Sequence, residues 1–410
     1  MDLREFSQRF AEIEAETRKA FLGQEDVLSS VLVAFFARGH VLIEGVPGVG
    51  KTLLVRVLGK VLGCHFRRIQ FTPDLMPSDV TGSTTYNAQL GTFEFKHGPV
   101  FTHVLLADEI NRAPAKTQSS MLEAMQERSV TVDGMTHPLP RPFFVLATQN
   151  PIESAGTYAL PEAQLDRFLF KVLIGHPPLA VEEAILRNVR DGFDASDLDA
   201  VGLEGRANPA TVVEMQRAVT EVRVDEQIIH YIATLAANTR KHRAVQIGAS
   251  PRAGISLLNV ARVEAAVQGR DFVVPDDVKI HGRAVLRHRL ILQPDAEIEG
   301  VNTDEVIESV LRETQVPGMG EAGRPRGSAF GASPSLGGGP PPRRMASYPP
   351  VAPLAVPGTG VESTLSPAPS GPSRPSGAPD SSASRPAGLS SRPFAGAPPS
   401  KSFGRSDEEP

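Results

Sequence analysis

The sequence predicts an α/β fold: a parallel-sheet core, a smaller all-helical domain and a tail without regular structure. Five short apolar runs alternate with helical or loop segments, at residues 41–44, 66–71, 104–107, 143–147 and 168–174. Strands separated by such crossovers form parallel sheets covered by helices on both faces. After Gly175-His176-Pro177-Pro178 the strand pattern largely gives way to helical periodicity. Chemistry in a sheet of this kind gathers at the carboxyl ends of its strands.

The remaining elements follow from periodicity and turn residues. Residues 5–21 carry apolar side chains at helical spacing, and residues 25–37 are apolar enough for a buried helix. Further helices are expected at 180–191, 209–223, 225–242, 252–268 and 275–289. Residues 74–98 predict a hairpin or a partly structured loop. Residues 129–141 predict a hairpin that turns at Asp133-Gly134.

Composition divides the chain into three predicted parts, at residues 1–178, 179–316 and 317–410. The last part holds 20 of the 36 prolines and is otherwise rich in Gly, Ser and Ala, so it cannot bury enough apolar surface to fold. That part carries a net charge of +3, and since the whole chain carries −5, the rest carries −8. An acidic folded part without a basic run argues against nucleic acid as the main partner.

Cysteine usage and hydropathy predict a cellular compartment. Cys64 is the only cysteine, so no intramolecular disulfide can form, and a reducing compartment is expected. The first residues are charged, and no apolar stretch approaches the roughly 18 residues of a membrane span. We therefore expect a cytoplasmic protein without membrane insertion.

A glycine-rich loop between the first strand and a helix predicts a phosphate site. The stretch Gly45-Val46-Pro47-Gly48-Val49-Gly50-Lys51-Thr52 fits the pattern G-x-x-x-x-G-K-[ST], and Leu53 continues into an apolar helix. Backbone N–H groups of such a loop form an anion nest at the helix N-terminus. Lys51 can reach the β- and γ-phosphates, and the Thr52 hydroxyl can ligate Mg²⁺. The expected ligands are therefore ATP and Mg²⁺, held by residues Gly45 through Leu53.

Polar residues at the ends of later strands extend this site. The strand at 104–107 ends in Asp108 and Glu109, which suit a metal ligand and a group that polarises the attacking water. Asn150 closes the next strand and could orient that water, although a polar residue before proline is also an ordinary turn opener. The guanidinium of Arg167 could stabilise charge on the transferring phosphoryl group, although an arginine taken alone is more typical of a surface salt-bridge partner.

One further arginine lies in the helical part. Ser250 and Pro251 predict an N-cap and a first helical residue, so Arg252 would project from the first turn of a helix. An arginine there is unfavourable for the helix dipole, which makes a phosphate partner more attractive. A solvated surface arginine is the alternative.

Together these residues resemble an AAA+ ATPase, and more narrowly the MoxR family. Gly45 to Thr52 matches Walker A and Val104 to Glu109 matches Walker B, while the run from Asp108 to Gln118, followed by Leu122 to Glu127, is specifically similar to MoxR proteins. The resemblance covers about residues 5–315. It implies that Asn150 is sensor 1, Arg167 the arginine finger and Arg252 sensor 2, and that the two hairpins are the inserts of this clade. It also places Gln24 beside the adenine, although Gln24 suits a helix boundary equally well.

The resemblance also implies an assembly and an activity. MoxR relatives form rings, usually hexamers, in which Arg167 would serve the neighbouring protomer's nucleotide and Arg252 the γ-phosphate of its own. The family implies a chaperone-like motor that remodels or matures a partner complex, often with a protein carrying a von Willebrand factor A domain. A nucleotide-gated scaffold with slow hydrolysis and a chelatase-type metal-insertion motor remain alternatives. A DNA-remodelling motor fits the acidic folded part least well.

Overall fold

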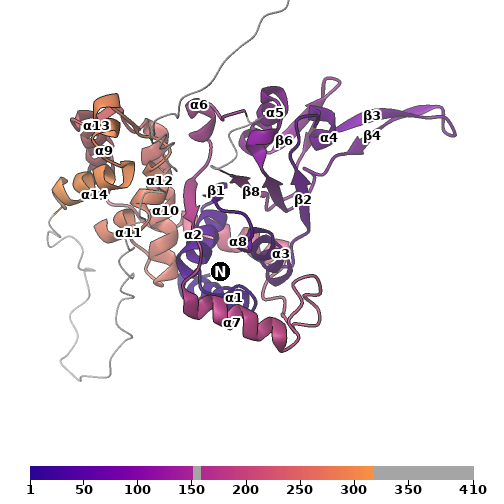
Figure 1. Ribbon diagram of the computed structural model, residues 1–410, viewed down its shortest axis with the longest axis horizontal. Helices are drawn as coiled ribbons and strands as arrows, with labels where there is room; N and C mark the ends of the chain where they lie inside the picture. The colour runs from indigo at the N-terminus through magenta and orange to yellow at the C-terminus, as the bar shows by residue number, and fades with distance from the viewer. Residues whose placement is uncertain (151–157, 318–410) are drawn as a thin grey trace, which may run out of the picture. The chain divides into compact units, whose positions relative to one another are not determined.

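A five-stranded parallel sheet forms the centre of the protein (Figure 1). The computed structural model describes residues 1–150 and 158–317, so the predicted disordered tail lies, from residue 318 onward, outside the described residues. All five predicted strands are confirmed, and they lie in the order β2-β5-β8-β1-β9. Their bounds are β1 (Val41–Gly45), β2 (Phe66–Gln70), β5 (Val104–Asp108), β8 (Phe144–Gln149) and β9 (Phe170–Ile174).

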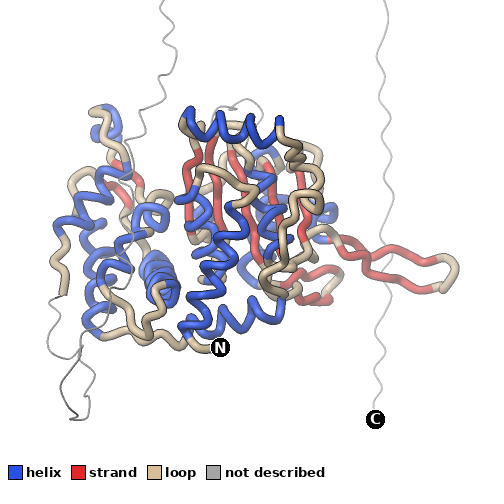
Figure 2. The backbone as a smooth tube through the Cα atoms, turned by 90° about the horizontal axis from the view of Figure 1, so that it is seen from below, coloured by secondary structure: helices blue, strands red, loops and turns tan. Residues whose placement is uncertain are grey.

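Alternate side chains of the strands enter two apolar clusters, one on each face of the sheet. Val41 and Ile43 of β1 pack with α1 (Leu3–Arg18), α2 (Glu25–Phe36) and α3 (Lys51–Val61). Leu42 packs on the other face, with α4 (Pro77–Thr81) and α5 (Ala115–Glu127). Figure 2 shows helices beside the strands of this sheet. The expected sheet with helices on both faces is confirmed, because successive residues of β1 are buried on opposite faces of the sheet, as a doubly covered strand requires.

Both inserted segments contain antiparallel hairpins. Residues 74–98 form the short helix α4 and then β3 (Gly82–Asn87) and β4 (Thr92–His97), which project away from the sheet in Figure 1. The second hairpin pairs β6 (Ser129–Val132) with β7 (Met135–Pro138). Its turn lies at Asp133 and Gly134, as predicted, with φ of 50° and 78°. Positive φ at both positions matches the twist of a two-residue hairpin.

The region after β9 is helical apart from one short sheet. Its small sheet pairs β10 (Val245–Ile247) with β11 (Ile291–Leu292). A short 3₁₀ turn, η1 (Ile110–Arg112), and the helix α6 (Glu162–Leu165) lie earlier in the chain. The helices that follow β9 are α7 (Leu179–Arg190), α8 (Pro209–Thr220), α9 (Glu226–Lys241), α10 (Pro251–Val267), α11 (Pro275–Ile280), α12 (Gly282–Leu286), α13 (Pro294–Ile298) and α14 (Thr303–Glu313).

One predicted helix is divided in the structure. Residues 275–289 were expected to form a single helix, but α11 ends before His281, whose φ and ψ are −105° and 14°. The buried His281 ring bonds the Glu264 carboxylate through Nε2 at 2.7 Å and stacks on Phe170, 5.1 Å between ring centroids. These tertiary contacts hold the backbone of His281 in a non-helical conformation. Apolar periodicity along the sequence does not reveal such contacts, so the break is not predicted.

Two smaller expectations concern Cys64 and the membrane. Cys64 is buried in the cluster around α3, and burial raises the pKa of its thiol to about 12. Cys64 is therefore a core residue. Within residues 1–150 and 158–317, every helix is too short or too polar to cross a bilayer.

The buried carboxylate of Glu16 fastens α1 to the segment that precedes α8. Its side chain is 2% exposed and accepts hydrogen bonds from Arg206, at 2.6 and 2.9 Å, and from Lys19, at 2.9 Å. The backbone N–H of Glu204 donates a further bond at 3.0 Å. Burial raises the pKa of Glu16, but these donors outweigh burial and lower it to about 2. The ionised form therefore stabilises the fold.

We predict that Glu16→Gln lowers the free energy of unfolding at pH 7 by about 1–3 kcal/mol, because the buried donors lose their anionic partner. Since the folded pKa of about 2 lies below the ordinary 4.5, this stabilisation is present above pH 4.5 and is lost as the pH falls toward 2. Urea unfolding between pH 7 and 3 measures both effects. The exposed pair Glu5–Arg9 supplies the control, Glu5→Gln, with an expected change below about 0.5 kcal/mol. Equal losses in the two variants would contradict the assignment.

Candidate active site

The glycine-rich loop joins β1 to α3 at the carboxyl end of the central strands. Gly45 lies so close to β9 that a Cβ atom there would be 2.1 Å from the carbonyl oxygen of Ile174. Gly48 and Gly50 have φ of 84° and 83°, a left-handed conformation that side chains disfavour. Gly50 caps α3 without a side-chain hydrogen bond, so the first N–H groups of that helix lack a side-chain acceptor at the cap. The loop therefore has the form of an anion nest.

Lys51 lies at the first position of α3 and folds back on the loop. Its Nζ donates to the carbonyl oxygen of Gly45 at 2.9 Å. Burial lowers the pKa of the half-buried Lys51, and the negative charges of Asp108 and Glu109 partly offset this effect. The ammonium group thus lies between the loop and the two carboxylates, where it can meet an anion.

Asp108 is held from two neighbouring strands. Thr148 of β8 donates its hydroxyl to Asp108 Oδ1 at 2.6 Å. Arg68 of β2 donates to Oδ2 through Nη2 and Nε, at 2.6 and 3.1 Å. Both contacts follow from strand order, because β2 and β8 each pair with β5 in parallel register. The carboxylate is therefore fixed in orientation before any ligand arrives.

Glu109 follows Asp108 in a conformation rare for a residue with a side chain, with φ of 57°. Its backbone N–H donates to the Thr148 hydroxyl at 2.8 Å, which supports this turn of the chain. The Glu109 carboxylate accepts a hydrogen bond from Gln70 Nε2 at 2.7 Å and lies 3.2 Å from Arg112 Nη1. Gln70 in turn accepts from Arg68 at 2.8 Å. A network of β2 side chains thus connects the two carboxylates.

An apolar cavity of about 510 Å³ adjoins the glycine-rich loop. Phe21, Gln24 and Leu53 line it on the side of the sheet domain. The other wall is the apolar face of α7, where Leu186 and Val189 are 69% and 57% exposed. Among the described residues, the buried Oε1 of Gln24 has no hydrogen-bond partner. A buried acceptor without a donor fits a ligand that carries an N–H group.

The predicted Asn150, Arg167 and Arg252 lie outside the lining of this cavity. Asn150 directly follows β8, next to the strand that carries Asp108. Arg167 is half-buried, and within the described residues its side chain makes no hydrogen bond or ion pair.

The contacts of Arg252 centre on Asp166. Its Nη1 lies 3.7 Å from Asp166 Oδ2. Asp166 also accepts hydrogen bonds from the buried Arg289, at 2.7 Å, and from the Ser250 hydroxyl, at 3.3 Å. Ser250 was predicted to cap α10; it occupies the N-cap position, but its hydroxyl bonds Asp166 instead of the helix backbone.

Sequence comparisons agree with this geometry. The model of the ATPase family associated with various cellular activities (AAA) matches residues 40–170, and the model of the AAA lid domain matches residues 237–310. Chaperone MoxR1 of Mycobacterium tuberculosis is 42% identical over 74% of this chain and 81% of its own. The chain belongs to the MoxR family of AAA+ ATPases. It is therefore an ATPase, and the helices after β9 include its AAA lid.

Two further comparisons support the assignment to the MoxR family. The uncharacterized protein YeaC of Bacillus subtilis is 45% identical over 73% of this chain and 92% of its own. The crystal structure of a candidate ATPase from Cytophaga hutchinsonii has a TM-score of 0.71 and 39% identity, and covers 77% of this chain and 97% of its own. The similarity spans nearly the whole of that solved chain, so it covers both the sheet domain and the AAA lid.

Among the residues that contact the carboxylates, three on the neighbouring strands are not predicted from the sequence. They are Arg68 and Gln70 of β2 and Thr148 of β8. Arg68 and Gln70 are two positions apart in a strand, so both extend on the same face. Two polar residues at this spacing near the end of a strand are the sequence pattern that could have predicted Arg68 and Gln70 as part of the site.

We predict that Thr148→Val lowers kcat for ATP hydrolysis by about 10- to 100-fold, as expected for loss of a residue that orients a ligand-binding group. Valine keeps the shape of threonine but removes the hydroxyl that bonds Asp108 and the Glu109 backbone. Steady-state ATPase assays measure kcat, and fluorescent-nucleotide titration measures binding, which we expect to change little. Thr131→Val on the β6–β7 hairpin, where the hydroxyl is exposed, is the matched control. A kcat within twofold of the unmodified enzyme would show that this bond is dispensable.

Proposed function

We propose that this MoxR-family ATPase is a ring-forming motor that uses ATP hydrolysis to remodel or mature a partner protein. The observation that carries the proposal is the position of Glu109, held by Gln70 at the carboxyl end of the sheet, with Lys51 close by. A carboxylate held beside a phosphate loop can accept a proton from water once it is released from Gln70. Hydrolysis would then be linked to release of the Glu109 carboxylate from the Gln70 side chain.

The residues of the loop would bind the triphosphate. Backbone N–H groups between Gly45 and Lys51, other than at Pro47, would donate to its oxygens, and Lys51 Nζ would leave the Gly45 carbonyl for the β- and γ-phosphates. Glu109 would take the proton of the attacking water, and Asn150 would hold that water through its amide. Each step uses a backbone or side-chain group at the carboxyl end of β1, β5 or β8.

The residues present fit Mg²⁺ as the metal. Thr52 and Asp108 offer hydroxyl and carboxylate oxygens, the donors that this hard cation prefers. The described residues contain no cluster of three or more acidic, histidine or cysteine side chains suited to a metal. Mg²⁺ is usually held by one or two carboxylates together with substrate phosphates, so a sparse set of protein ligands is suitable. When bound, the ion supplies neutralisation of charge on the phosphates.

The cavity beside α7 suits the adenosine part of ATP. Its walls are largely apolar side chains, and Gln24 Oε1 is a buried acceptor without a partner. The exocyclic amino group of adenine is a donor that would satisfy this atom. Leu53 and α7 would cover the faces of the base.

The contacts of Arg167 and Arg252 support a proposal for the assembly, and the name of a relative supports a proposal for the partner. Arg167 has no intramolecular partner among the described residues, which supports a role toward the neighbouring protomer's nucleotide in a hexameric ring. Arg252 would respond to the γ-phosphate as sensor 2, although Asp166 is its nearest charged neighbour here. A relative named chaperone MoxR1 supports a protein client. A protein carrying a von Willebrand factor A domain is the partner that the family resemblance implies.

The exposed β3–β4 hairpin supports contact with protein. Tyr86, Leu90 and Phe93 are 59%, 66% and 74% exposed there. Clustered apolar side chains on a projecting hairpin are typical of interaction sites. The proposed parts are the ATP-binding domain at 1–178, the AAA lid at 179–316 and the tail at 317–410, in a cytoplasmic protein.

We predict that Glu109→Gln lowers kcat for ATP hydrolysis by about 10²- to 10⁴-fold, because an amide cannot accept the proton of water. ATP affinity is expected to remain, since the loop and Lys51 are unchanged. Phosphate release and nucleotide titration measure the two quantities. Glu94→Gln, on the exposed β4 strand, is the control. The Glu109→Gln variant, which keeps its bound ATP, would also serve as bait for partner proteins. Turnover at the unmodified rate would exclude Glu109 as the base.

We predict that Arg167→Ala abolishes most ATPase activity and that mixing it with Lys51→Ala restores part of it. In a mixed ring, an intact Lys51 site would receive an intact Arg167 from the neighbour. ATPase rate against mixing ratio measures rescue, and mixing either variant with the doubly substituted chain is the control. Absence of rescue at every ratio, in material that sizes as a mixed assembly, would contradict action across the interface.

A further inference from the structure

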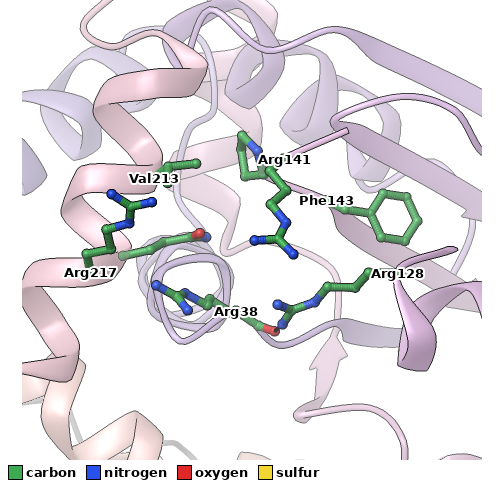
Figure 3. Close-up of a pocket in the computed structure, with 8 residues that line it drawn as sticks. Arg38, Arg128, Arg141, Phe143, Val213 and Arg217 are labelled. Carbon is green, nitrogen blue, oxygen red and sulfur yellow. Dashed lines mark hydrogen bonds between the residues drawn. The ribbon is translucent and has the colours of Figure 1, made fainter. Parts of the chain in front are cut away.

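Four arginines from separate segments surround a second cavity, of about 80 Å³. We name it the arginine pocket: Arg38 follows α2, Arg128 follows α5, Arg141 precedes β8, and Arg217 lies in α8. Arg38 and Arg141 come just before the start of β1 and β8, whereas the glycine-rich loop follows the end of β1. The pocket therefore lies at the amino edge of the sheet, away from the candidate active site. Figure 3 shows the four guanidinium groups gathered around one hollow.

The charge of the arginine pocket is not neutralised within the described residues. None of its four arginines forms an ion pair with a carboxylate in residues 1–150 and 158–317. Burial, and then the positive charges of Arg141 and Arg217, lower the pKa of Arg38. Burial, and then Arg38 and Arg141, do the same to Arg128. Like charges in a partly desolvated site repel each other, and an anion removes that repulsion.

The nearest histidine adds no charge at neutral pH. Burial lowers the pKa of His40 to about 4, and its Nδ1 accepts the backbone N–H of Val145 at 3.0 Å. Its Nε2 lies 3.1 Å from the carbonyl oxygen of Met125. Because a carbonyl oxygen can only accept a hydrogen bond, Nε2 carries the proton of the neutral ring. His40 is therefore a neutral ring that fixes the strand edge, and the arginines determine the charge of the pocket.

The backbone holds two of the arginines in place. Arg38 and Arg128 have φ of 57° and 52°, uncommon for residues other than glycine. Arg128 Nη2 donates to the Arg38 carbonyl at 3.2 Å, so the two strained positions are tied together. Gln216, which also lines the pocket, donates to the Phe35 carbonyl at 2.8 Å and fixes α8 against α2. Both positions end a helix, where a left-handed residue is common, so the ends of α2 and α5 fix where these two side chains begin.

We propose that the arginine pocket binds a compact oxyanion of the phosphate class. Guanidinium groups match tetrahedral oxyanions through paired N–H donors, and no other charged group of the described chain satisfies them. A volume of about 80 Å³ exceeds the roughly 10–15 Å³ that one water requires, and so admits a polyatomic ion. The ion would link α2, the base of the β6–β7 hairpin and α8.

The test uses the full-length Lys51→Ala chain, which weakens phosphate binding at the glycine-rich loop. We expect inorganic phosphate to raise the Tm by about 2 °C or more over sodium chloride of equal ionic strength, because a ligand of the folded state alone stabilises it. In that background, Arg141→Gln with Arg217→Gln should remove most of this rise. The same pair should leave the Tm in chloride unchanged or higher, since two repelling charges are lost. Calorimetric titration with inorganic phosphate should show the corresponding loss of binding.

The control replaces two exposed arginines that lack ion pairs in the described structure, Arg4→Gln with Arg243→Gln, and matches the change in net charge. It should keep the full response to phosphate. Glycerol 3-phosphate distinguishes the source: a rise with inorganic phosphate alone indicates a free ion, and a rise with both indicates a phosphoryl group of a larger molecule. No rise beyond chloride, or an equal rise in the Arg141/Arg217 variant and the control, would overturn the proposal. The proposal would also be overturned if, in sodium chloride, the Tm of the Arg141/Arg217 variant were lower than the Tm of the control.

Discussion

The parallel pairing of β5 with β2 on one side and β8 on the other is the constraint on which the active site depends. The register sets Gln70 opposite Asp108 and Ala107 opposite Ala147. Gln70 therefore reaches Glu109, and Thr148 reaches Asp108 from the other side. A slip of one residue in either pairing would turn these side chains to the opposite face of the sheet. The apolar clusters on both faces oppose such a slip, since it would expose buried side chains.

The two edges of the sheet differ in how their charges are compensated. At the carboxyl edge, Asp108 and Glu109 each have a positively charged neighbour, Arg68 and Arg112. At the amino edge, the arginine pocket has no anionic partner among the described residues. Where charges are paired within the protein, the side chains are held in position before a ligand binds. Where they are unpaired, binding of an oppositely charged ligand itself stabilises the folded protein. The central strands join these two kinds of site within one rigid layer.

Most of the fold could be predicted because its signals are local. The glycine-rich loop, the strands and the Asp133-Gly134 turn each depend on consecutive residues, and the structure places them as expected. The partners of Asp108 could not be predicted, because β2, β5 and β8 are neighbours only in the spatial order of the sheet. The break at His281 depends on Glu264 and Phe170, which approach it only after folding. The arginine pocket spans positions 38 to 217 and has no pattern along the chain.

Asp166, the residue directly before Arg167, contacts several residues of the AAA lid. Its carboxylate accepts from Arg289 and Ser250 and lies near Arg252. The lid and the backbone of Arg167 are thus connected through the Asp166 side chain and one planar peptide unit, and Arg289 also donates to the carbonyl oxygens of Asp166 and Phe168. If Arg167 serves the adjacent protomer, as proposed, a tilt of the lid would shift that arginine relative to the neighbouring nucleotide.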